Sequence, residues 1–198
     1  MNVFYDPDSL PSINKIVTNK KLIVDELNDN LKKDEFMGFR SDFYDKKTEK
    51  VQGSWTATQV FYNRTRKGKA VPPIWESREA KKIWLRTLKE SPSRYPKTNQ
   101  ILNQCPCVYW AGMSCIGGNS SISPHKHTYN TPTLILQICM EMGTHAGSCD
   151  LIAGGETMNW NHKYQVNIFD GRCEHELINT MDCSRYIFHV EFDPGSVI

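Results

Sequence analysis

The sequence lacks several features that would assign it to a special class of protein. Residues 1–30 contain no apolar segment of the kind that signal peptides carry. No apolar run reaches the roughly 18 residues that a membrane-spanning helix needs. The formal net charge is only +2, which is too small to indicate a nucleic-acid partner. We therefore expect a cytoplasmic protein with no membrane or nucleic-acid partner.

The sequence also gives no sign of a disulfide-dependent fold. Its 198 residues are enough to bury one hydrophobic core without covalent cross-links. The seven cysteines are an odd number, which favours reduced thiols and a cytoplasmic setting. Apolar residues make up 39% and charged residues 23%, as in ordinary globular proteins. We expect a single domain that spans residues 1–198.

A helical pattern occupies the first half of the sequence and a strand pattern the second. Between Ile13 and Leu31, apolar residues recur at spacings of three and four, as on one face of a helix that begins at Pro11. A second helix is expected to begin near Ser77 and to end at Pro92 and Pro96, and the segment 64–74 before it is expected to be a loop.

From about residue 105, short segments rich in β-branched and aromatic residues alternate with glycine-rich turns. The strand segments cover 108–110, 133–138, 164–169 and 185–192. Helices followed by many short strands indicate a closed β-sandwich or barrel with flanking helices. We expect a mainly β (α+β) domain, with a helical part at about 1–104 and a β core at about 105–198.

Three histidines have a spacing that suits a metal site. His125 and His127 are two residues apart, so both would point to the same face of an extended chain. His175 follows fifty residues later, after a predicted strand, and this spacing is typical of jelly-roll iron sites. The other interpretation is that the pair consists of ordinary surface histidines. His145, His162 and His189 lack such spacing, and we interpret them as loop or core histidines.

Arg185 begins a strongly apolar predicted strand, ten residues after His175. A guanidinium keeps its charge when buried, so it needs an anionic partner. A dicarboxylate such as 2-oxoglutarate could provide one through paired hydrogen bonds. An ion pair with an Asp or Glu of the core is the alternative.

Several segments together resemble one known family. The segment FDGRCEHE at 169–176, followed by Arg185, resembles the aspartyl/asparaginyl β-hydroxylase family, whose members carry Phe-Asp-x-x-x-Glu-His-Glu and an arginine ten residues after the histidine. The segment PHKHTYN at 124–130 is similar to the family's Pro-His-x-Gly-x-x-Asn. Ser114, Trp55 and the segment GETMNW at 155–160 also occupy places that match this family.

The resemblance implies a double-stranded β-helix, or jelly-roll, that uses Fe(II), 2-oxoglutarate and O₂. By this match His125 and His175 are the iron ligands. Arg185 and Ser114 hold the distal carboxylate of 2-oxoglutarate, and Trp55 forms a wall of the co-substrate pocket.

Two departures from the family pattern concern the site itself. His127 stands where the family has glycine, and it either completes a three-histidine site or points away. Leu134 and Leu136 stand at the spacing of an arginine and a histidine that help to bind the co-substrate. The proximal carboxylate would then be held by another residue; the candidates are Gln137, Asn130 and Lys126.

The sequence therefore predicts an Fe(II)- and 2-oxoglutarate-dependent dioxygenase that hydroxylates a C–H bond of a soluble substrate. That substrate would be an Asp- or Asn-like residue in a peptide, or a free amino acid. Two alternatives stay open at this point. One is a non-catalytic jelly-roll that binds a metal or a small acid, and the other is a three-histidine cupin-like dioxygenase that does not use 2-oxoglutarate.

Overall fold

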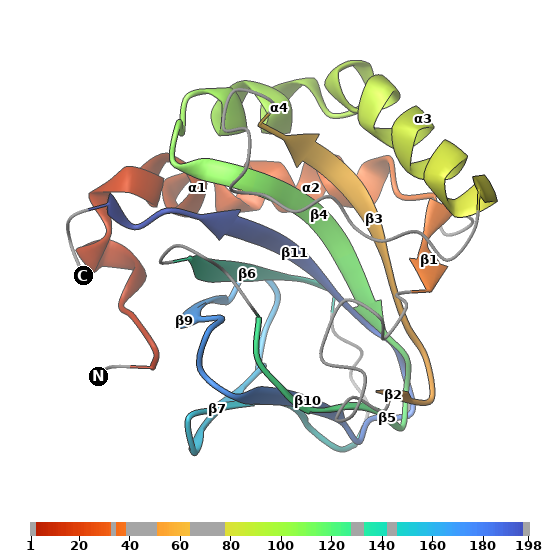
Figure 1. The fold of residues 1–198 in the computed structure, drawn as a ribbon, viewed down its shortest axis with the longest axis vertical. Helices are drawn as coiled ribbons and strands as arrows, with labels where there is room; N and C mark the ends of the chain where they lie inside the picture. The colour runs from red at the N-terminus through yellow and green to blue at the C-terminus, as the bar shows by residue number, and fades with distance from the viewer. Residues whose placement is uncertain are drawn as a thin grey trace.

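Two antiparallel β-sheets face each other in this protein, and helices cover the outside of the larger sheet (Figure 1). The computed structural model describes residues 3–32, 35–38, 51–63, 78–127, 133–141 and 146–195. The predicted loop at 64–74, the predicted helix start at Ser77, and the candidates Asn130 and His145 lie outside these residues.

The larger sheet has six strands in the order β1-β3-β4-β11-β6-β9. These strands are β1 (Met37–Gly38), β3 (Trp55–Tyr62), β4 (Val108–Ile116), β11 (Arg185–Phe192), β6 (Leu134–Glu141) and β9 (Val166–Asp170). The smaller sheet has five strands in the order β2-β5-β10-β7-β8. They are β2 (Val51–Gln52), β5 (Ser120–His125), β10 (His175–Asn179), β7 (Cys149–Ala153) and β8 (Glu156–Asn159). This arrangement confirms the predicted jelly-roll with flanking N-terminal helices.

The helical elements lie before and between the first strands. They are the 3₁₀ turns η1 (Pro7–Ser9) and η2 (Pro11–Ile13), and the α-helices α1 (Asn14–Thr18), α2 (Lys20–Asp29), α3 (Arg78–Arg94) and α4 (Pro96–Asn103). The single predicted N-terminal helix is divided at Asn19, whose side-chain amide donates to the carbonyl of Lys15. The predicted end of the second helix at Pro92 is also wrong, because α3 continues to Arg94 and Pro96 begins the next helix.

The two faces of the larger sheet pack into separate hydrophobic clusters. On β11, Phe188, Val190 and Phe192 point outward and pack with residues of α2 and α4. Ile187 points inward and packs with residues of the smaller sheet, such as Leu151. This alternation is the period of two that a strand requires, and it divides β11 into a structural face and a face that is available to a site.

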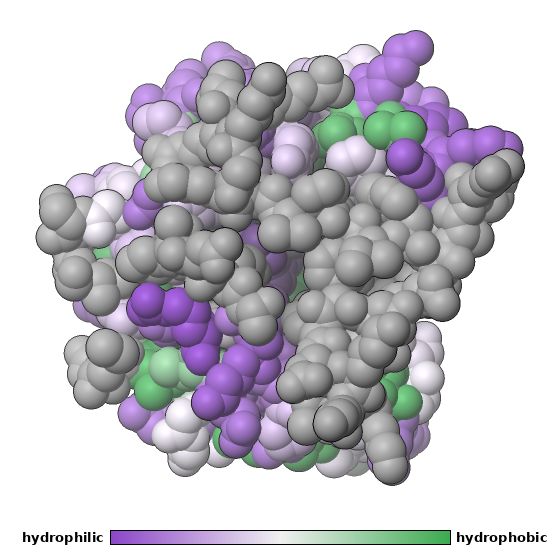
Figure 2. Space-filling view, viewed as in Figure 1, coloured by the Kyte–Doolittle hydropathy of each residue, from purple (hydrophilic) through white to green (hydrophobic). Residues whose placement is uncertain are grey.

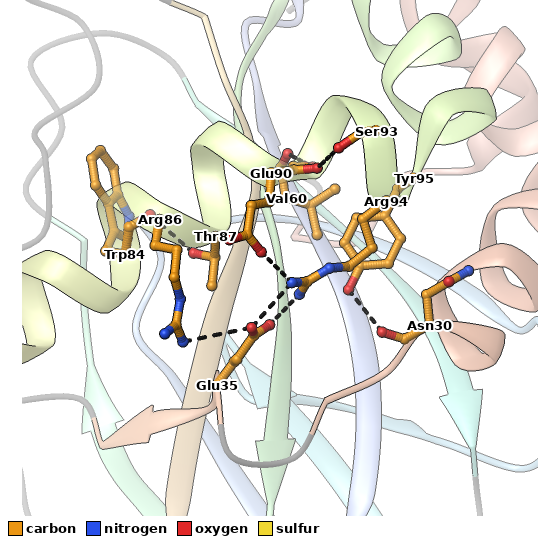
Figure 3. A network of polar contacts seen from close by, with 11 residues as sticks. Asn30, Glu35, Val60, Trp84, Arg86, Thr87, Glu90, Ser93, Arg94 and Tyr95 are labelled. Carbon is orange, nitrogen blue, oxygen red and sulfur yellow. Dashed lines mark hydrogen bonds and ion pairs between the residues drawn. The ribbon is translucent and has the colours of Figure 1, made fainter.

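A buried ion-pair network fastens the residues before β1 to α3 (Figure 3). The Glu35 carboxylate accepts hydrogen bonds from both terminal nitrogens of Arg94, and the Arg86 guanidinium lies 3.7 Å away. Arg94 also donates to Glu90, one helical turn earlier, at 2.5 Å. The side chains of Glu35 and Arg94 are only 5% and 11% exposed, so removing one partner would cost more stability than breaking a surface ion pair.

The surface of the molecule is mostly polar where the structure describes it. On the face shown in Figure 2, hydrophilic side chains predominate among the coloured residues, and hydrophobic ones form small separate areas. Leu22 and Leu85 are the large apolar side chains that are exposed among the described residues. None of the described helices combines the length and hydrophobicity that a transmembrane span requires. All seven cysteines are free thiols, as expected.

Candidate metal centre and co-substrate site

His125 and His175 lie directly opposite each other on paired strands. β5 and β10 are antiparallel neighbours, and these two residues are partners in their register. Their ring centroids are 4.2 Å apart. The register shifts between His175 and Leu177, because β5 has one more residue than β10 over this stretch. This β-bulge accommodates Pro124, which has no backbone N–H to donate. The predicted pairing of the two histidines therefore exists in the fold.

His127 belongs to the same cluster. Its backbone N–H donates to the carbonyl of Gly171 at 2.9 Å, just after β9 ends. Its ring centroid lies 5.6 Å from that of His125 and 5.0 Å from that of His175. The three histidines offer ligand nitrogens that all lie within 4.8 Å of one another. Two metal–nitrogen bonds of about 2.1 Å span at most about 4.2 Å, so small ring rotations would bring all three to one ion.

Backbone carbonyls fix the tautomers of two of these imidazoles. The Nδ1–H of His125 donates to the carbonyl of Ser123 at 2.8 Å, and the Nδ1–H of His175 donates to the carbonyl of Cys173 at 2.9 Å. A carbonyl oxygen can only accept, so each Nδ1 carries the proton and each Nε2 carries the ring's lone pair. Metal-binding histidines commonly have this outer hydrogen bond.

The surroundings also keep these imidazoles neutral. Burial, together with the neighbouring imidazole of His125, lowers the pKa of His175 to about 3. Burial likewise lowers the pKa of His125. For His127, burial and the imidazoles of His175 and His125 lower the pKa well below its ordinary value. Three neutral nitrogen donors suit a divalent transition metal better than a hard, oxygen-seeking cation such as Mg²⁺.

Arg185 is buried on the inner face of the larger sheet without an anionic partner. It is 1% exposed, and its Nε and Nη1 atoms have no hydrogen-bond partner. Its guanidinium carbon lies 4.7 Å from the centroid of the Trp160 ring. Burial lowers the pKa of Arg185, while the nearby thiols of Cys149 and Cys139 act in the opposite direction. No described Asp or Glu pairs with it, so the structure speaks against the alternative of a core ion pair.

Ser114 and Trp55 lie on the same inner face as Arg185. Arg185 and Trp55 flank Ile116 of the strand between them, each as its direct register partner. Ser114 lies two residues before Ile116, so it is a diagonal neighbour of both. The Trp55 indole N–H donates to the Ser114 hydroxyl at 2.8 Å. The six predicted site residues thus form two groups: the three histidines lie on or next to the smaller sheet, and Arg185, Ser114 and Trp55 lie on the inner face of the larger one.

The inference that Leu134 and Leu136 occupy the family's basic positions in the site is wrong. Both leucines are fully buried in the outer cluster, under the helices. Ile135 packs in the inner cluster, and alternation along β6 turns Gln137 inward with it. The spacing argument selected the wrong face by one residue. Of the candidates named in their place, Gln137 faces the interior, whereas Lys126 is exposed.

Two residues near the site were not recognised from the sequence as functional. Trp160 was noted only as part of a similar segment, yet its ring lies against Arg185. His189 was interpreted as an ordinary loop or core histidine, yet it points inward from β11 and lies close enough to lower the pKa of His127 and of His175. The signal for His189 was present: it is four residues after Arg185 on one strand, and so on the same face.

A model of the aspartyl/asparaginyl β-hydroxylase family matches residues 18–194. The chain belongs to this family. Both histidine segments, Arg185 and the helices from α2 onward lie inside the matched region. No curated protein matches the chain in sequence.

Solved structures resemble the chain only in general outline. A predicted oxalate decarboxylase from Thermotoga maritima is 13% identical, with a TM-score of 0.39 over 79% of this chain and 98% of that protein. A cupin-like protein from the same organism is 7% identical, with a TM-score of 0.41 over 81% and 79%. A cupin domain from Schizosaccharomyces pombe is 8% identical, with a TM-score of 0.41 over 73% and 68%. Similarity at this level carries no functional argument.

Proposed function

We propose that this member of the aspartyl/asparaginyl β-hydroxylase family is an Fe(II)- and 2-oxoglutarate-dependent dioxygenase that hydroxylates a C–H bond of an amino acid, free or within a peptide. One observation carries the proposal. Arg185 is a buried cation with two donors that lack a partner, on the sheet that faces three clustered histidines.

The three histidines fit the metal. His125 and His175 would be the ligands common to the family, since each presents the lone pair of Nε2. His127 would be a third nitrogen donor, where the family has glycine. Because all three imidazoles are neutral, a divalent metal would not have to displace protons from them near neutral pH.

The environment of Arg185 fits the distal carboxylate of 2-oxoglutarate. Nε and Nη1 lie on different edges of the guanidinium, so a carboxylate on either edge would give an acceptor to one of these two donors. The Ser114 hydroxyl is the predicted second donor, and Trp55 keeps it in place. Trp160 stacks on the guanidinium and shields it from water.

Gln137 is the best-placed residue for the proximal end of the co-substrate. It is 7% exposed, and its side-chain carbonyl oxygen has no partner. An amide can turn to donate N–H to a carboxylate. We propose that Gln137 serves in place of the basic pair that sequence spacing had assigned to Leu134 and Leu136.

The chain's own contribution would be binding and orientation. When bound, iron and 2-oxoglutarate supply the activation of O₂ and the oxidising power that a C–H bond demands. Arg185 and Ser114 would fix the co-substrate at one end and the histidines at the other, so that its orientation is set before O₂ enters. The apolar side chains between the sheets, such as Ile116 and Ile187, would exclude water.

The clustering of His127 with the other two histidines favours a second candidate. A three-histidine centre could serve a cupin-like dioxygenase that does not need 2-oxoglutarate. Arg185 distinguishes the two functions, because a dioxygenase that does not use 2-oxoglutarate would leave the buried guanidinium without an anionic ligand.

The decisive measurement is succinate formation by the purified chain with Fe(II), ascorbate and 2-oxoglutarate. We expect slow succinate formation without added substrate, and Arg185→Ala should raise the 2-oxoglutarate concentration required by at least about tenfold. Arg94→Ala is the matched control, since it removes a buried arginine outside the site and should leave this requirement unchanged. Oxygen uptake that is indifferent to 2-oxoglutarate would support the three-histidine alternative. Metal binding without turnover would support a non-catalytic protein.

A further inference from the structure

We propose that the substrate carries a cationic group in its side chain, an ammonium or a guanidinium, and that Glu191 together with the indole of Trp110 binds it. This inference rests on the proposed function, because it assigns the substrate class of that same site. The observations behind it concern the inner face of the larger sheet, next to the residues assigned to the metal and the co-substrate.

The inner face of β11 runs from a buried cation to a partly exposed acid. Arg185, Ile187, His189 and Glu191 alternate along the strand and point inward. Arg185 and Ile187 are 1% and 2% exposed, whereas the side chains of His189 and Glu191 are 15% and 18% exposed. The interior between the sheets is therefore closed at the Arg185 end and accessible to solvent at the Glu191 end. A substrate would enter on the side of Glu191.

Glu191 lies on the metal side of this face. Its direct partner on β6 is Ile135. The Ile135 side chain lies against Gly171, since a Cβ at that glycine would be 2.6 Å from Ile135 Cδ1 and 3.5 Å from His127 Nδ1. One apolar side chain and one glycine thus separate Glu191 from the histidine cluster. A ligand group held at Glu191 would keep a carbon a few bonds away close to the metal.

Polar side chains form a row across the sheet, next to Glu191. Four neighbouring strand pairs bring four polar residues and one glycine into register, and these are Gln59, Gly112, His189, Gln137 and Asn167. In this row Gln137 Oε1, Asn167 Nδ2 and His189 Nε2 are buried without hydrogen-bond partners. Gln137 and Asn167 are 7% and 3% exposed. Buried polar atoms without partners are costly. Because the proposed co-substrate accounts for Gln137, the unpaired atoms of Asn167 and His189 are the ones that indicate a further polar ligand between the sheets.

The charge on this part of the sheet favours a cation. Among the described residues that this inner face keeps at least partly buried, Glu191 is the only acid. The Nε2 of His189 lies 3.6 Å from its carboxylate, and its strand partners Trp110 and Ile135 offer no positive charge. A carboxylate in such a setting attracts a cationic ligand more strongly than one in open water.

Trp110 adds a second feature that suits a cation. Its indole N–H donates to the Gln59 side-chain carbonyl, which fixes the ring on the inner face. Its ring centroid lies 5.2 Å from that of His189. Trp110 is also the strand partner of Glu191, and an indole beside a carboxylate is a combination that can bind ammonium and guanidinium groups through cation–π contact and charge together.

The test compares ligands that differ only in charge. L-arginine and its isostere L-citrulline, whose side chain is uncharged, are titrated calorimetrically into the full chain with Zn(II) and 2-oxoglutarate, so that no turnover occurs. L-lysine and L-aspartate are titrated in parallel. We expect the wild-type chain to bind arginine or lysine at least about tenfold more tightly than citrulline or aspartate. Glu191→Gln should abolish this preference, and Glu191→Asp should keep it.

A matched control and a second readout complete the test. Glu156→Gln removes an exposed carboxylate at the edge of the smaller sheet and should retain the preference for cations. A wild-type chain that binds neither cation better than its neutral counterpart overturns the proposal, as does a preference that survives in Glu191→Gln. Failure of the dioxygenase assignment is recognised separately, because it appears as absent succinate formation and does not enter the calorimetric comparison.

Discussion

Replacement of Arg185 by methionine should stabilise the ligand-free protein while abolishing its response to 2-oxoglutarate. Arg185 is 1% exposed and keeps two donors without partners, so the folded chain carries an uncompensated charge in an apolar interior. Methionine fills a similar volume without charge. Replacing buried charges by apolar residues of similar size is commonly neutral or stabilising.

The expected magnitude follows from the two unsatisfied donors. Each buried polar group without a partner costs about 1–3 kcal/mol, and the stacking on Trp160 offsets about 1 kcal/mol of this. Arg185→Met should therefore raise the free energy of unfolding by about 2 kcal/mol. For a chain of 198 residues, this corresponds to a Tm higher by about 6 °C.

Binding of 2-oxoglutarate should make the wild-type protein more stable than the Arg185→Met variant. At a thousand times its dissociation constant, 2-oxoglutarate adds about 4 kcal/mol to the stability of the protein that binds it. With Zn(II) and 2-oxoglutarate, the wild-type protein should thus unfold at a higher temperature than the variant; without them, at a lower one. Thermal unfolding followed by circular dichroism measures both. A variant that is less stable than the wild type in both conditions would refute the reasoning, since Arg185 would then be a structural residue.

Three further outcomes are expected elsewhere in the molecule. Glu35→Gln should lower the free energy of unfolding by about 3 kcal/mol in urea titrations, because it leaves Arg94 buried without a full counter-charge. Although burial opposes the ionisation of Asp170, hydrogen bonds from Arg172 outweigh it and lower the pKa of that carboxyl below 3.8. Asp170 therefore stabilises the fold at pH values above its unfolded pKa of about 3.9, and this contribution disappears as the pH falls through the lower pKa of the folded state. Asp170→Asn should thus make the free energy of unfolding depend less on pH at acid pH. His127→Gly should weaken Co(II) binding by about tenfold without abolishing it, as followed by the visible spectrum of the bound metal, whereas complete loss would show that all three histidines are indispensable.

Much of the fold could be predicted from local patterns. The β-branched and aromatic residues of 185–192 and the glycine-rich turns indicated a closed β-structure, and β11 confirms the bounds of that strand. Pro92 misled the prediction of a helix end because tertiary contacts outweigh the local cost of proline in a last turn. Ser91, the residue before it, bonds to the backbone of Val60 on β3 and holds that turn against the sheet.

The site could be predicted where strand pairing determines which residues are neighbours in space. It could not be predicted where the preceding loop determines which face of the next strand a residue occupies. His125, His175 and Arg185 were found because a resemblance fixed their spacing. Leu134 and Leu136 were misassigned because spacing along the sequence does not determine which face of β6 a residue occupies, and a shift of one residue exchanges the two faces. Glu191 gave no signal at all, since its importance comes from its strand partners.

The bulge at Pro124 means that the two strands of the metal centre do not tolerate length changes equally. A single deletion in β5 between Ile122 and His125 would remove the extra residue, and His125 would stay the register partner of His175. In β10 no residue is extra, so a deletion between His175 and Leu177 would turn His175 to the opposite side of its strand. A descendant of this protein could thus lose its metal through one change in β10 and persist as a binding protein, with the guanidinium of Arg185 still in place to hold an acid.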